Sequence, residues 1–386
     1  MSIQYNTLEV RVRLAAIRAN YRLLAGRGGK VVGVIKADAY GHGLGEVAEA
    51  LLREGCDTFA VGTVGEGVTL REFLDAKGLK AGDSGERDIR IISLLGPVVA
   101  EDYPLLWQHR LIPFVGSFRQ LEELARHAAK SMKPLSVSLK FDTGMARLGF
   151  TPEELPRLLD RLREAPLIRP VMASSHLATA DEPDSLDVVQ AQGQLFGEIL
   201  IALAAAGHKV EANIANSAGI LGHPALHHQS QRAGIALYGA NPFGGTAWEH
   251  LGQGLAAAME VRTRIASVHP LPKGRSISYG GTFTAERDMT VAIVCAGYAD
   301  GYSRGLSGKG AQVLISGRRA PLVGRVCMQL CAVDVTDIPD VRSGDWAVLL
   351  GGEGKLAIRA EELASWWGTI TYEVFCLLGL NRRVYI

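Results

Sequence analysis

The sequence predicts an α/β protein in two parts, a closed barrel of alternating strands and helices followed by a mainly antiparallel β domain. Two observations support this fold class. Up to about residue 245, short apolar runs typical of buried strands alternate with amphipathic helical stretches. After residue 255, apolar and polar residues alternate with period two between short turns, and no long helical pattern returns before 360–367.

Eight apolar runs in the first part are the predicted barrel strands, and helical patterns separate most of them. Eight parallel strands joined by helices close into a TIM-type (β/α)8 barrel. A weakly alternating run at 5–13 precedes them, and 76–88 is polar, as expected of a surface insertion. The predicted strands are 31–35, 58–63, 90–95, 112–115, 136–141, 170–175, 212–215 and 234–237, and the predicted helices include 15–24, 46–53, 65–75, 118–130, 152–164 and 186–206.

The second part has the pattern of a separate β domain. Its predicted strands are 260–268, 290–294, 312–315, 319–323, 331–335 and 346–350. The change of pattern divides the chain into three segments: an N-terminal strand at 1–12 that packs with the C-terminal domain, the barrel at 13–245, and the β domain at 255–386. The linker is expected near 241–250.

Composition narrows the class of partner. A net charge of +1 argues against nucleic acid or an anionic membrane. The sequence shows no signal peptide, and no apolar run approaches the ~20 residues of a membrane span, so we expect a cytoplasmic protein without a membrane partner. Five scattered cysteines suit a reducing compartment, and no residue pattern predicts a metal site.

The stretch 31–43 is the centre of the functional argument. Lys36 ends the first predicted strand, and a turn containing Tyr40 and glycines follows it. Two interpretations of Lys36 are open from its position alone. A lysine at a strand end can extend its ammonium group into solvent. Alternatively, desolvation lowers the pKa of its amine and makes it a nucleophile that forms a Schiff base.

Polar or titratable residues follow four other predicted strands as well. A barrel carries its chemistry at the C-terminal strand ends, and packing does not explain the whole set. Lys140 beside Asp142 has an alternative interpretation as a buried ion pair. The set comprises Lys36 and Tyr40, then Lys140, Asp142 and Arg147, then His176 and Asp181, then Asn216 and Ser217, and finally Arg232 and Gly234.

The last two of these turns have the composition of a phosphate cradle. Asn216 and Ser217 offer a helix cap and a hydroxyl, and Gly234 offers a backbone donor. Ordinary turn and cap chemistry is the alternative for either loop alone. A Schiff-base lysine opposite a phosphate cradle points to pyridoxal phosphate (PLP) as cofactor, because PLP needs both.

Nine motifs in this order resemble the alanine racemase family over essentially the whole chain. The resemblance implies a PLP-dependent enzyme that interconverts L- and D-alanine, supplying D-alanine for peptidoglycan or serving alanine catabolism. It also implies a head-to-tail homodimer, in which the β domain of one subunit completes the active site of the other. The motifs are VIKADAYGHG, KFDTGMARLGF, SSHLATADE, ANSAG, QRAGIALYG, SYGGTFTA, GYADGYSR, VGRVCMQ and TYEVF.

The same resemblance assigns roles to individual residues. Lys36 and Tyr279 are the two catalytic acid–base groups, on opposite faces of the cofactor-bound substrate, and Lys36 holds PLP as a Schiff base. Arg147 and Met328 contact the substrate carboxylate, and Lys140 matches a lysine that is often carbamylated. The cofactor-binding residues are Lys36, Tyr40, Arg147, His176, Asn216, Ser217, Arg232, Gly234, Ile235 and Tyr372, and the entry-channel residues are Asp181, Tyr298, Arg304, Arg325 and Ile370.

Arg232 and Gln329 distinguish this chain from other PLP enzymes and from its family, respectively. Most PLP enzymes place a carboxylate against the pyridine nitrogen, whereas the resemblance places the always-charged guanidinium of Arg232 there. The family usually has an aspartate where this chain has Gln329, which puts substrate breadth in question.

Three rival functions remain to be tested. A serine or broad-specificity racemase is a close variant, although Tyr372 leaves little room beside the substrate side chain. An amino-acid decarboxylase of related architecture would need a glutamate in place of Arg232. A non-enzymatic PLP carrier or homeostasis protein would resemble the barrel alone, and the β domain that carries Tyr279 argues against it.

Overall fold

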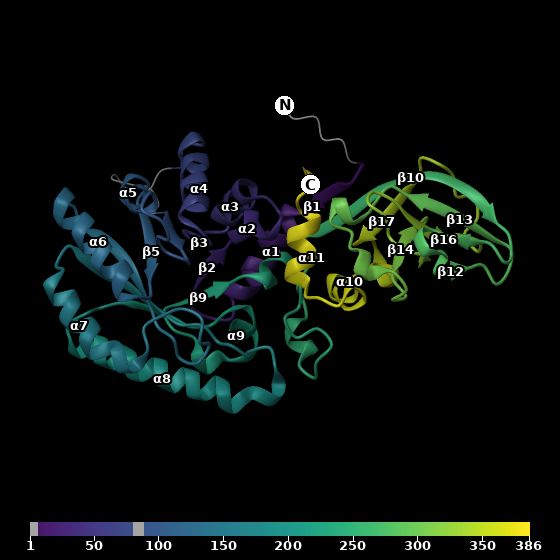
Figure 1. The fold of residues 1–386 in the computed structure, drawn as a ribbon. Helices are drawn as coiled ribbons and strands as arrows, with labels where there is room; N and C mark the ends of the chain where they lie inside the picture. Colours follow the sequence, from purple (N-terminus) through teal and green to yellow (C-terminus); the bar gives the residue numbers. More distant parts are fainter. Residues whose placement is uncertain (1–6, 80–88) are drawn as a thin grey trace.

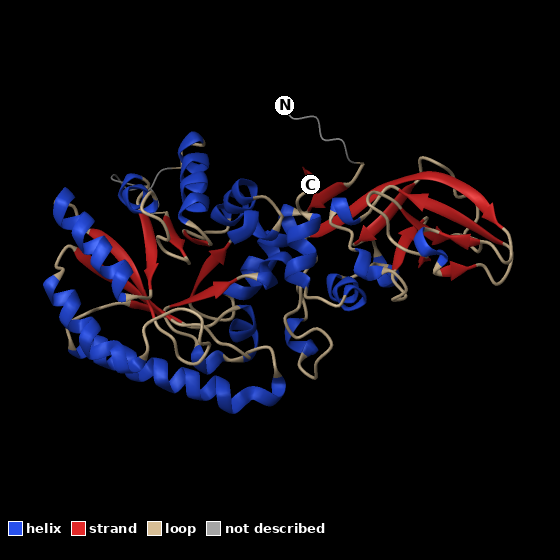
Figure 2. Cartoon of the chain, viewed as in Figure 1, coloured by secondary structure: helices blue, strands red, loops and turns tan. Residues whose placement is uncertain are grey.

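The computed structural model of the chain describes residues 7–79 and 89–386. The predicted N-terminal segment therefore lies partly outside the described residues, as does most of the predicted insertion at 76–88. The chain forms two adjoining parts of an elongated molecule, a barrel wrapped in helices and a smaller β-rich part (Figures 1 and 2).

The first part is a parallel barrel of eight strands in the order β8-β7-β6-β5-β4-β3-β2-β9. Neighbouring strands pair in parallel, and the Arg232 N–H donates to the Ala215 carbonyl oxygen (2.9 Å), which links β9 to the chain leaving β8. The strands are β2 Lys30–Val34, β3 Thr58–Val61, β4 Arg90–Ser93, β5 Leu111–Val115, β6 Leu135–Lys140, β7 Ile168–Ser174, β8 Glu211–Asn213 and β9 Ser230–Ala233.

Helices cover the outside of the barrel (Figure 2). Their apolar stripes face the strands, as in α6, where Leu121, Leu124 and Ala128 are buried at helical spacing. The helices of this part are α1 Leu14–Ala25, α2 Lys36–Tyr40, α3 Leu44–Arg53, α4 Val64–Ala76, α5 Asp102–Gln108, α6 Phe118–Ser131, α7 Leu155–Glu164, α8 Leu186–Ala205 and α9 Ser217–Gly222.

The prediction for the eighth strand is wrong. The strand is Ser230–Ala233, whereas Ile235–Tyr238 forms a 3-10 turn that ends at Gly239. All four residues of β9 are buried although three are polar, and two of these have hydrogen-bond partners: Gln231 donates to the Gly28 carbonyl oxygen (2.8 Å) and Arg232 to the Asn213 carbonyl oxygen (3.2 Å). The apolar run 234–237 therefore marks the buried turn after β9, and not the strand itself.

The helix α8 matches the predicted helix 186–206, but its composition departs from the expectation that no segment is apolar enough to span a membrane. Together with the preceding turn it forms Pro183–Ala205, which by length and composition is long and apolar enough to cross a membrane. Its buried residues nevertheless fall on one face, and Gln192 on that face bonds both the Ala178 N–H (2.9 Å) and the His176 carbonyl oxygen (3.0 Å). This is the pattern of an outer barrel helix.

The second part is a small antiparallel barrel. The long strand β10 pairs with β17 through its first half and with β13 through its second half, and β14, β15 and β16 complete the circuit. The strands β1 and β18 extend the same sheet beside β10. The elements are β1 Glu9–Val12, β10 Met259–Leu271, β11 Ser276–Ile277, β12 Phe283–Thr284, β13 Met289–Val294, β14 Gln312–Ile315, β15 Arg318–Val323, β16 Cys331–Asp334, β17 Trp346–Leu350, α10 Ala360–Trp367, α11 Thr371–Leu378 and β18 Arg382–Tyr385.

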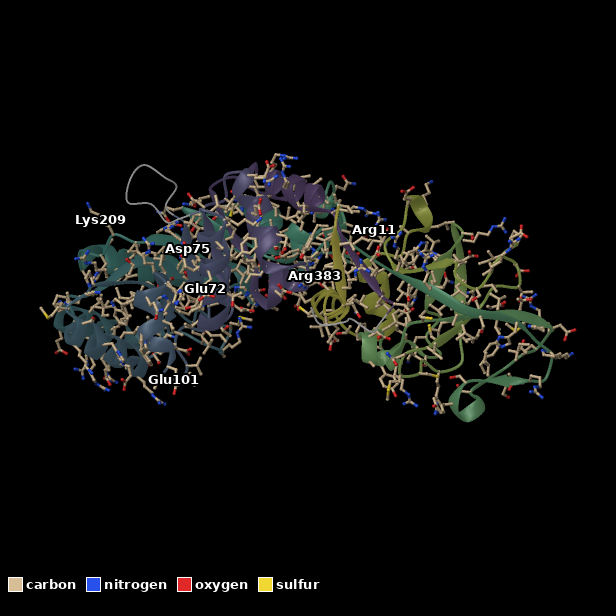
Figure 3. All side chains as sticks on the ribbon, turned by 90° about the horizontal axis from the view of Figure 1, so that it is seen from above. Arg11, Glu72, Asp75, Glu101, Lys209 and Arg383 are labelled. Carbon is tan, nitrogen blue, oxygen red and sulfur yellow. The ribbon has the colours of Figure 1, made fainter. Side chains whose placement is uncertain are left out.

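Charged pairs tie the two parts together at their junction. The buried carboxylate of Glu260 pairs with Arg11 (2.9 Å) and Arg13 (3.0 Å). Viewed from above, Arg11 and Arg383 lie at this junction, far from Glu101 and Lys209 on the barrel (Figure 3). The backbone is close-packed there too: Gly239 has φ +84°, and a Cβ atom on it would clash with the Ala256 carbonyl.

The contact at Gly239 leads to a stability prediction. Gly239→Ala should lower the free energy of unfolding by about 1–3 kcal/mol more than Gly207→Ala does, because overpacking adds to the cost of a left-handed alanine. Gly207 is the matched control, since it has φ +88° and open space around its Cα. Urea denaturation of both variants measures the difference, and equal losses would show that the linker relaxes around the added methyl group.

Candidate active site

The C-terminal ends of the barrel strands bring the predicted polar residues to one mouth. Lys36 follows β2, Lys140 ends β6, His176 follows β7, Ser217 follows β8, and Arg232 lies in β9. The charges of Arg147 and Arg232 both act on Lys36, and those of Lys36, Lys140, Arg147 and Arg232 all act on His176. The structure thus gathers side chains that are far apart in the sequence.

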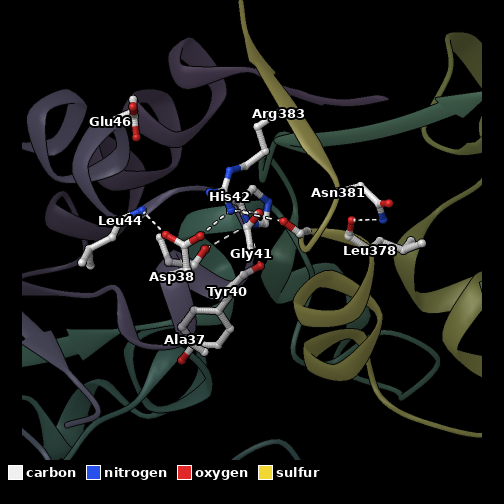
Figure 4. Close-up of polar contacts among 12 residues, drawn as sticks. Ala37, Asp38, Tyr40, Gly41, His42, Leu44, Glu46, Leu378, Asn381 and Arg383 are labelled. Atoms are coloured by element: carbon white, nitrogen blue, oxygen red, sulfur yellow. Dashed lines mark hydrogen bonds and ion pairs between the residues drawn. The ribbon is translucent and has the colours of Figure 1, made fainter. Parts of the chain in front are cut away.

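Lys36 opens a strained turn. The next four residues, 37–40, all have φ between 52° and 55°, so they form a turn of left-handed helix. This conformation costs about 1–2 kcal/mol per residue for L-amino acids, and such strain persists where surrounding contacts enforce it. The Ala37 N–H donates to Glu66 Oε1 (2.7 Å). The Asp38 carboxylate accepts from the Leu44 N–H (2.7 Å), as Figure 4 shows.

Burial and positive neighbours favour the neutral amine of Lys36. Burial lowers the pKa of Lys36, and the charge of Arg147 lowers it further, whereas Cys376 and Glu66 act in the opposite direction. Its ammonium nitrogen lies 6.0 Å from the ring centre of Tyr40. Of the two sequence-based interpretations, a solvated lysine does not suit this surrounding, and a nucleophilic lysine does.

Arg232 is buried among neutral partners. Its guanidinium donates to the Asn213 side chain and backbone, to the Ser175 carbonyl oxygen, and to His176 Nδ1 (3.1 Å). Burial lowers the pKa of Arg232 to about 10, so the side chain stays charged near neutral pH. Burial and the surrounding cations lower the pKa of His176 well below its usual value, which leaves the ring neutral with Nδ1 as the acceptor.

Lys140 is a second amine with a lowered pKa. Burial first, and then Arg232, lower the pKa of Lys140 to about 7, while Asp142 opposes them. The ammonium group donates to the Phe141 carbonyl oxygen (2.9 Å). One oxygen of Asp142 accepts instead from the N–H groups of residues 144, 145 and 146 (2.9–3.1 Å). The structure therefore favours a Lys140 amine that is partly neutral near pH 7 over a simple ion pair with Asp142.

The residues of the predicted phosphate cradle lie together. Ser217 Oγ accepts from the N–H groups of Gly234 (2.9 Å) and Ala236 (3.2 Å), and Asn216 caps α9 by accepting from the Gly219 N–H (2.9 Å). A Cβ atom on Gly234 would lie 2.8 Å from the Tyr40 hydroxyl, so a larger residue there would displace Tyr40.

Tyr372 of α11 closes the group, with its ring centre 5.8 Å from that of Tyr40. Burial, and then the charge of Asp181, raise the pKa of Tyr372 to about 12. The group thus offers hydroxyl donors, several cations, and a glycine that leaves room for a ligand, which is what a phosphate ester with an aldehyde needs. These residues therefore fit PLP.

Other predicted residues do not join this group within the chain. Tyr279 is 71% exposed and Met328 is 58% exposed. Tyr279 begins the turn between β11 and β12, in the outer part of the C-terminal domain and distant from α2 (Figure 1). Arg325 lies beside it, since its guanidinium would be 3.0 Å from a Cβ atom on Gly280. Tyr298, Arg304 and Ile370 are exposed as well.

Gln329 contacts a buried acid. Burial raises the pKa of Asp300, and hydrogen bonds from the Gly297 N–H and the Gln329 side chain oppose that shift. The amide therefore acts as a donor to Asp300, a role that a carboxylate at position 329 would fill only when protonated.

Sequence reasoning missed three residues that hold the lysine turn in place: Asp38 within the turn, and Glu66 and Arg383, which contact it. Glu66 was identifiable, because Thr63 and Glu66 form a capping box at the start of α4, and the same carboxylate reaches Ala37. A separate cavity of about 290 Å³ lies at the junction of the two parts, between Arg13, Asn241, Arg359 and Glu361, and it does not include Lys36.

The fold and the site together define a barrel enzyme with a lysine and a phosphate cradle for PLP and a C-terminal β domain. Family models for the alanine racemase N-terminal and C-terminal domains match residues 12–242 and 258–385. The chain belongs to the alanine racemase family, and it interconverts L- and D-alanine.

Individual relatives support this over both parts of the chain. The chain is 54% identical over 385 residues to the alanine racemase of Nitratidesulfovibrio vulgaris (strain Miyazaki F), covering all of both chains. Among solved structures, it is 36% identical to the biosynthetic alanine racemase of Pseudomonas aeruginosa, with a TM-score of 0.83 over 99% of each chain. The alanine racemase of Bartonella henselae, 29% identical with a TM-score of 0.85 over 98% of this chain and 99% of that one, holds covalently bound PLP.

These similarities confirm the predicted family, fold class, reaction and cofactor. They set aside the PLP carrier, because the C-terminal domain is matched together with the barrel, and the decarboxylase, because the domain models and the full-length relative are those of alanine racemase.

The lowered pKa of Lys140 predicts a pH-dependent stability. The unfolded chain keeps this proton up to pH 10.5, whereas the folded protein releases it above about pH 7. The unfolded state therefore binds more protons in between, and stability rises with pH by up to about 1.4 kcal/mol per unit. In CO₂-free buffer without cofactor, Lys140→Met should stabilise the protein most at pH 7 and below, and this advantage should shrink toward pH 10.

Lys130→Met is the control for this measurement, because Lys130 is exposed on α6. Its difference from the wild type should stay flat over the same range in urea denaturation. A flat difference for Lys140→Met as well would show that the amine is charged in the folded protein.

Proposed function

We propose that Lys36 and Tyr279 are the two acid–base groups of alanine racemisation. Racemisation removes the α-hydrogen from one face and returns a hydrogen to the other, so two groups on opposite faces perform it directly. When bound, PLP supplies the electron sink that acidifies the α-hydrogen. The lowered pKa of Lys36 supports a neutral amine that accepts a proton at Nζ, on the face used by D-alanine. Tyr279 serves the face used by L-alanine.

The remaining assigned residues bind and orient the cofactor and the substrate. Tyr40, Asn216, Ser217, Gly234, Ile235 and Tyr372 hold the phosphate, which the contacts of Tyr40 with Gly234 and Tyr372 support. Arg147 and Met328 hold the substrate carboxylate. Lys140 becomes carbamylated, since a pKa of about 7 leaves a neutral amine for CO₂, and the new negative charge fixes Arg147.

Arg232 controls the reaction type, with His176 as its partner. Its guanidinium stays charged and can only donate, so it holds a hydrogen bond at the pyridine nitrogen without protonating it. The unprotonated pyridine nitrogen limits the delocalisation of negative charge into the cofactor ring and thereby suppresses transamination. The contact of Arg232 with neutral His176, rather than with a carboxylate, supports this role.

The working enzyme is a head-to-tail homodimer that shares its active sites. The observation that supports it is the exposure of Tyr279 on a domain that does not reach its own barrel mouth. Large apolar side chains are exposed around that face, including Met328, Leu330 and Tyr298, and a second set is exposed on the barrel loops, at Leu95, Val98, Val99 and Leu148. Two separate apolar patches on one chain suit a two-fold pair in which each covers the other.

Substrate entry passes Asp181, Tyr298, Arg304, Arg325 and Ile370. The proximity of Asp181 to Tyr372 supports the first of these assignments. Tyr372 limits the space for larger substrate side chains and so favours alanine over serine, while the contact of Gln329 with Asp300 sets the range of substrates accepted.

The enzyme acts in the cytoplasm and supplies D-alanine for peptidoglycan or serves alanine catabolism. The domain division remains 1–12, 13–245 and 255–386.

Mixing two inactive variants tests the shared site. Lys36→Ala and Tyr279→Phe should each abolish most activity, but a heterodimer of the two has one site with both groups intact. After dissociation and reassociation of equal amounts, activity should return to about a quarter of the wild-type value, because half of the dimers carry one intact site. The assay is D-alanine formation from L-alanine. Unmixed and mixed samples of equal, negligible activity would contradict the shared site.

Isotope exchange tests which acid–base group serves which face of the substrate. In Tyr279→Phe, single-turnover loss of deuterium from α-deuterated L-alanine should fall by about 10²-fold or more, because the phenol is its base. Loss from α-deuterated D-alanine should persist, since Lys36 is intact. NMR measures both, and equal reductions for the two enantiomers would overturn the assignment. Tyr298→Phe, a neighbouring exposed tyrosine, is the control and should affect both enantiomers alike.

A further inference from the structure

The lysine turn is bound to the C-terminal strand of the chain. Asp38, within the turn, forms an ion pair with Arg383 of β18 (Figure 4). Arg383 also donates to the carbonyl oxygens of Gly41 (3.4 Å) and Gly379 (3.2 Å). One guanidinium therefore joins the turn after Lys36 to the end of α11.

The backbones meet at the same place. A Cβ atom on Gly41 would lie 2.9 Å from Gly379 Cα and would clash with the Phe375 carbonyl, and one on Gly379 would clash with Gly41. A little further along, the Tyr385 hydroxyl donates to Glu46 (3.1 Å) in α3. The C-terminal residues thus contact the turn and the helix α3 that follows it at several points.

The turn needs such external contacts. Its internal hydrogen bonds, such as Gly41 N–H to the Ala37 carbonyl oxygen (3.0 Å), close the left-handed helix but do not fix its direction. Glu66 fixes the beginning by accepting from the Ala37 N–H. Arg383 is placed to fix the middle and end, through Asp38 and Gly41. Since Lys36 precedes the strained residues and Tyr40 is the last of them, the direction of the turn sets where both side chains point.

We propose that Arg383 is a positioning residue, which orients Lys36 and Tyr40 by holding the left-handed turn through Asp38 and Gly41. The proposal rests on the proposed role of Lys36 as the cofactor lysine. Because β18 pairs with β1, and β1 pairs with β10, the same arginine couples the turn to the sheet of the C-terminal domain. The placement of Lys36 and the placement of that domain are therefore linked.

A purely stabilising ion pair is the competing explanation, and half-exposed pairs contribute little to stability. The experiment compares Arg383→Ala, Arg383→Lys and Asp38→Asn. Asp38→Asn keeps an acceptor for the Leu44 N–H and removes the charge. The control is Arg262→Ala, which removes the pair with Glu9 (2.6 Å) in the same sheet; the side chains of Arg262 and Arg383 are 25% and 26% exposed.

Three readouts separate position from stability: the Kd for PLP, the visible circular dichroism of the bound cofactor, and the acetylation rate of Lys36 in the cofactor-free protein by mass spectrometry. Arg383→Ala should weaken PLP binding by about tenfold, equal to about 1.4 kcal/mol. It should also change the dichroism and the acetylation rate, and lower kcat more than it raises KM. Arg383→Lys should recover part of each loss, Asp38→Asn should lie between, and Arg262→Ala should leave all three readouts near wild type.

The outcomes are distinguishable from those of the proposed function. Borohydride reduction of wild-type holoenzyme followed by peptide mapping should place the cofactor on Lys36, and a label elsewhere would refute that assignment itself. With the label on Lys36, Arg383 variants that match Arg262→Ala in all three readouts would overturn the positioning role alone. If Arg383→Ala does not fold, the same comparison is made with Arg383→Lys and Asp38→Asn.

Discussion

The concentration of positive charge at the barrel mouth is the constraint on which the site depends. Lys36, Lys140 and Arg232 are buried or half-buried there beside Arg147, and two nearby carboxylates, those of Asp142 and Glu66, are committed elsewhere. Asp142 accepts from three backbone N–H groups, and Glu66 from those of Gly62, Thr63 and Ala37. Uncompensated cations in low dielectric are costly, so the protein lowers the pKa of its amines and keeps His176 neutral.

The same cost explains why PLP binds and why the amines react. In the proposed site an anionic cofactor would relieve the repulsion among the cations, so part of its binding energy would come from strain already present in the cofactor-free protein. The neutral form of Lys36 that burial favours is also the form that the proposed roles of nucleophile and base require. Binding and reactivity therefore share one physical cause, and Arg232, whose pKa stays high, is the charge that remains.

How far the sequence predicts this site depends on the range of the interactions. Lys36, Lys140 and His176 were predictable because strand ends of a barrel converge by topology. The eighth strand was misplaced because β9 buries polar residues whose partners lie elsewhere in the chain, as Gln231 shows with Gly28. The pair of Asp38 and Arg383 spans 345 positions and depends on a parallel pairing of β1 with β18, which no local pattern encodes.

The C-terminal domain follows from a limit of the barrel itself. Every barrel strand end points into the same mouth, so the barrel supplies acid–base groups from one side of a flat substrate. A group on the opposite side must come from outside the barrel. The C-terminal domain extends away from its own barrel (Figure 1), and the exposed Tyr279 that it carries is the group proposed for that side. An exposed tyrosine gains function only when another surface encloses it. In the proposed dimer each barrel mouth is that surface. The ion pair of Arg383 in β18 with the lysine turn, and the pairing of β18 with β1 and of β1 with β10, join the projecting domain to the barrel that carries it.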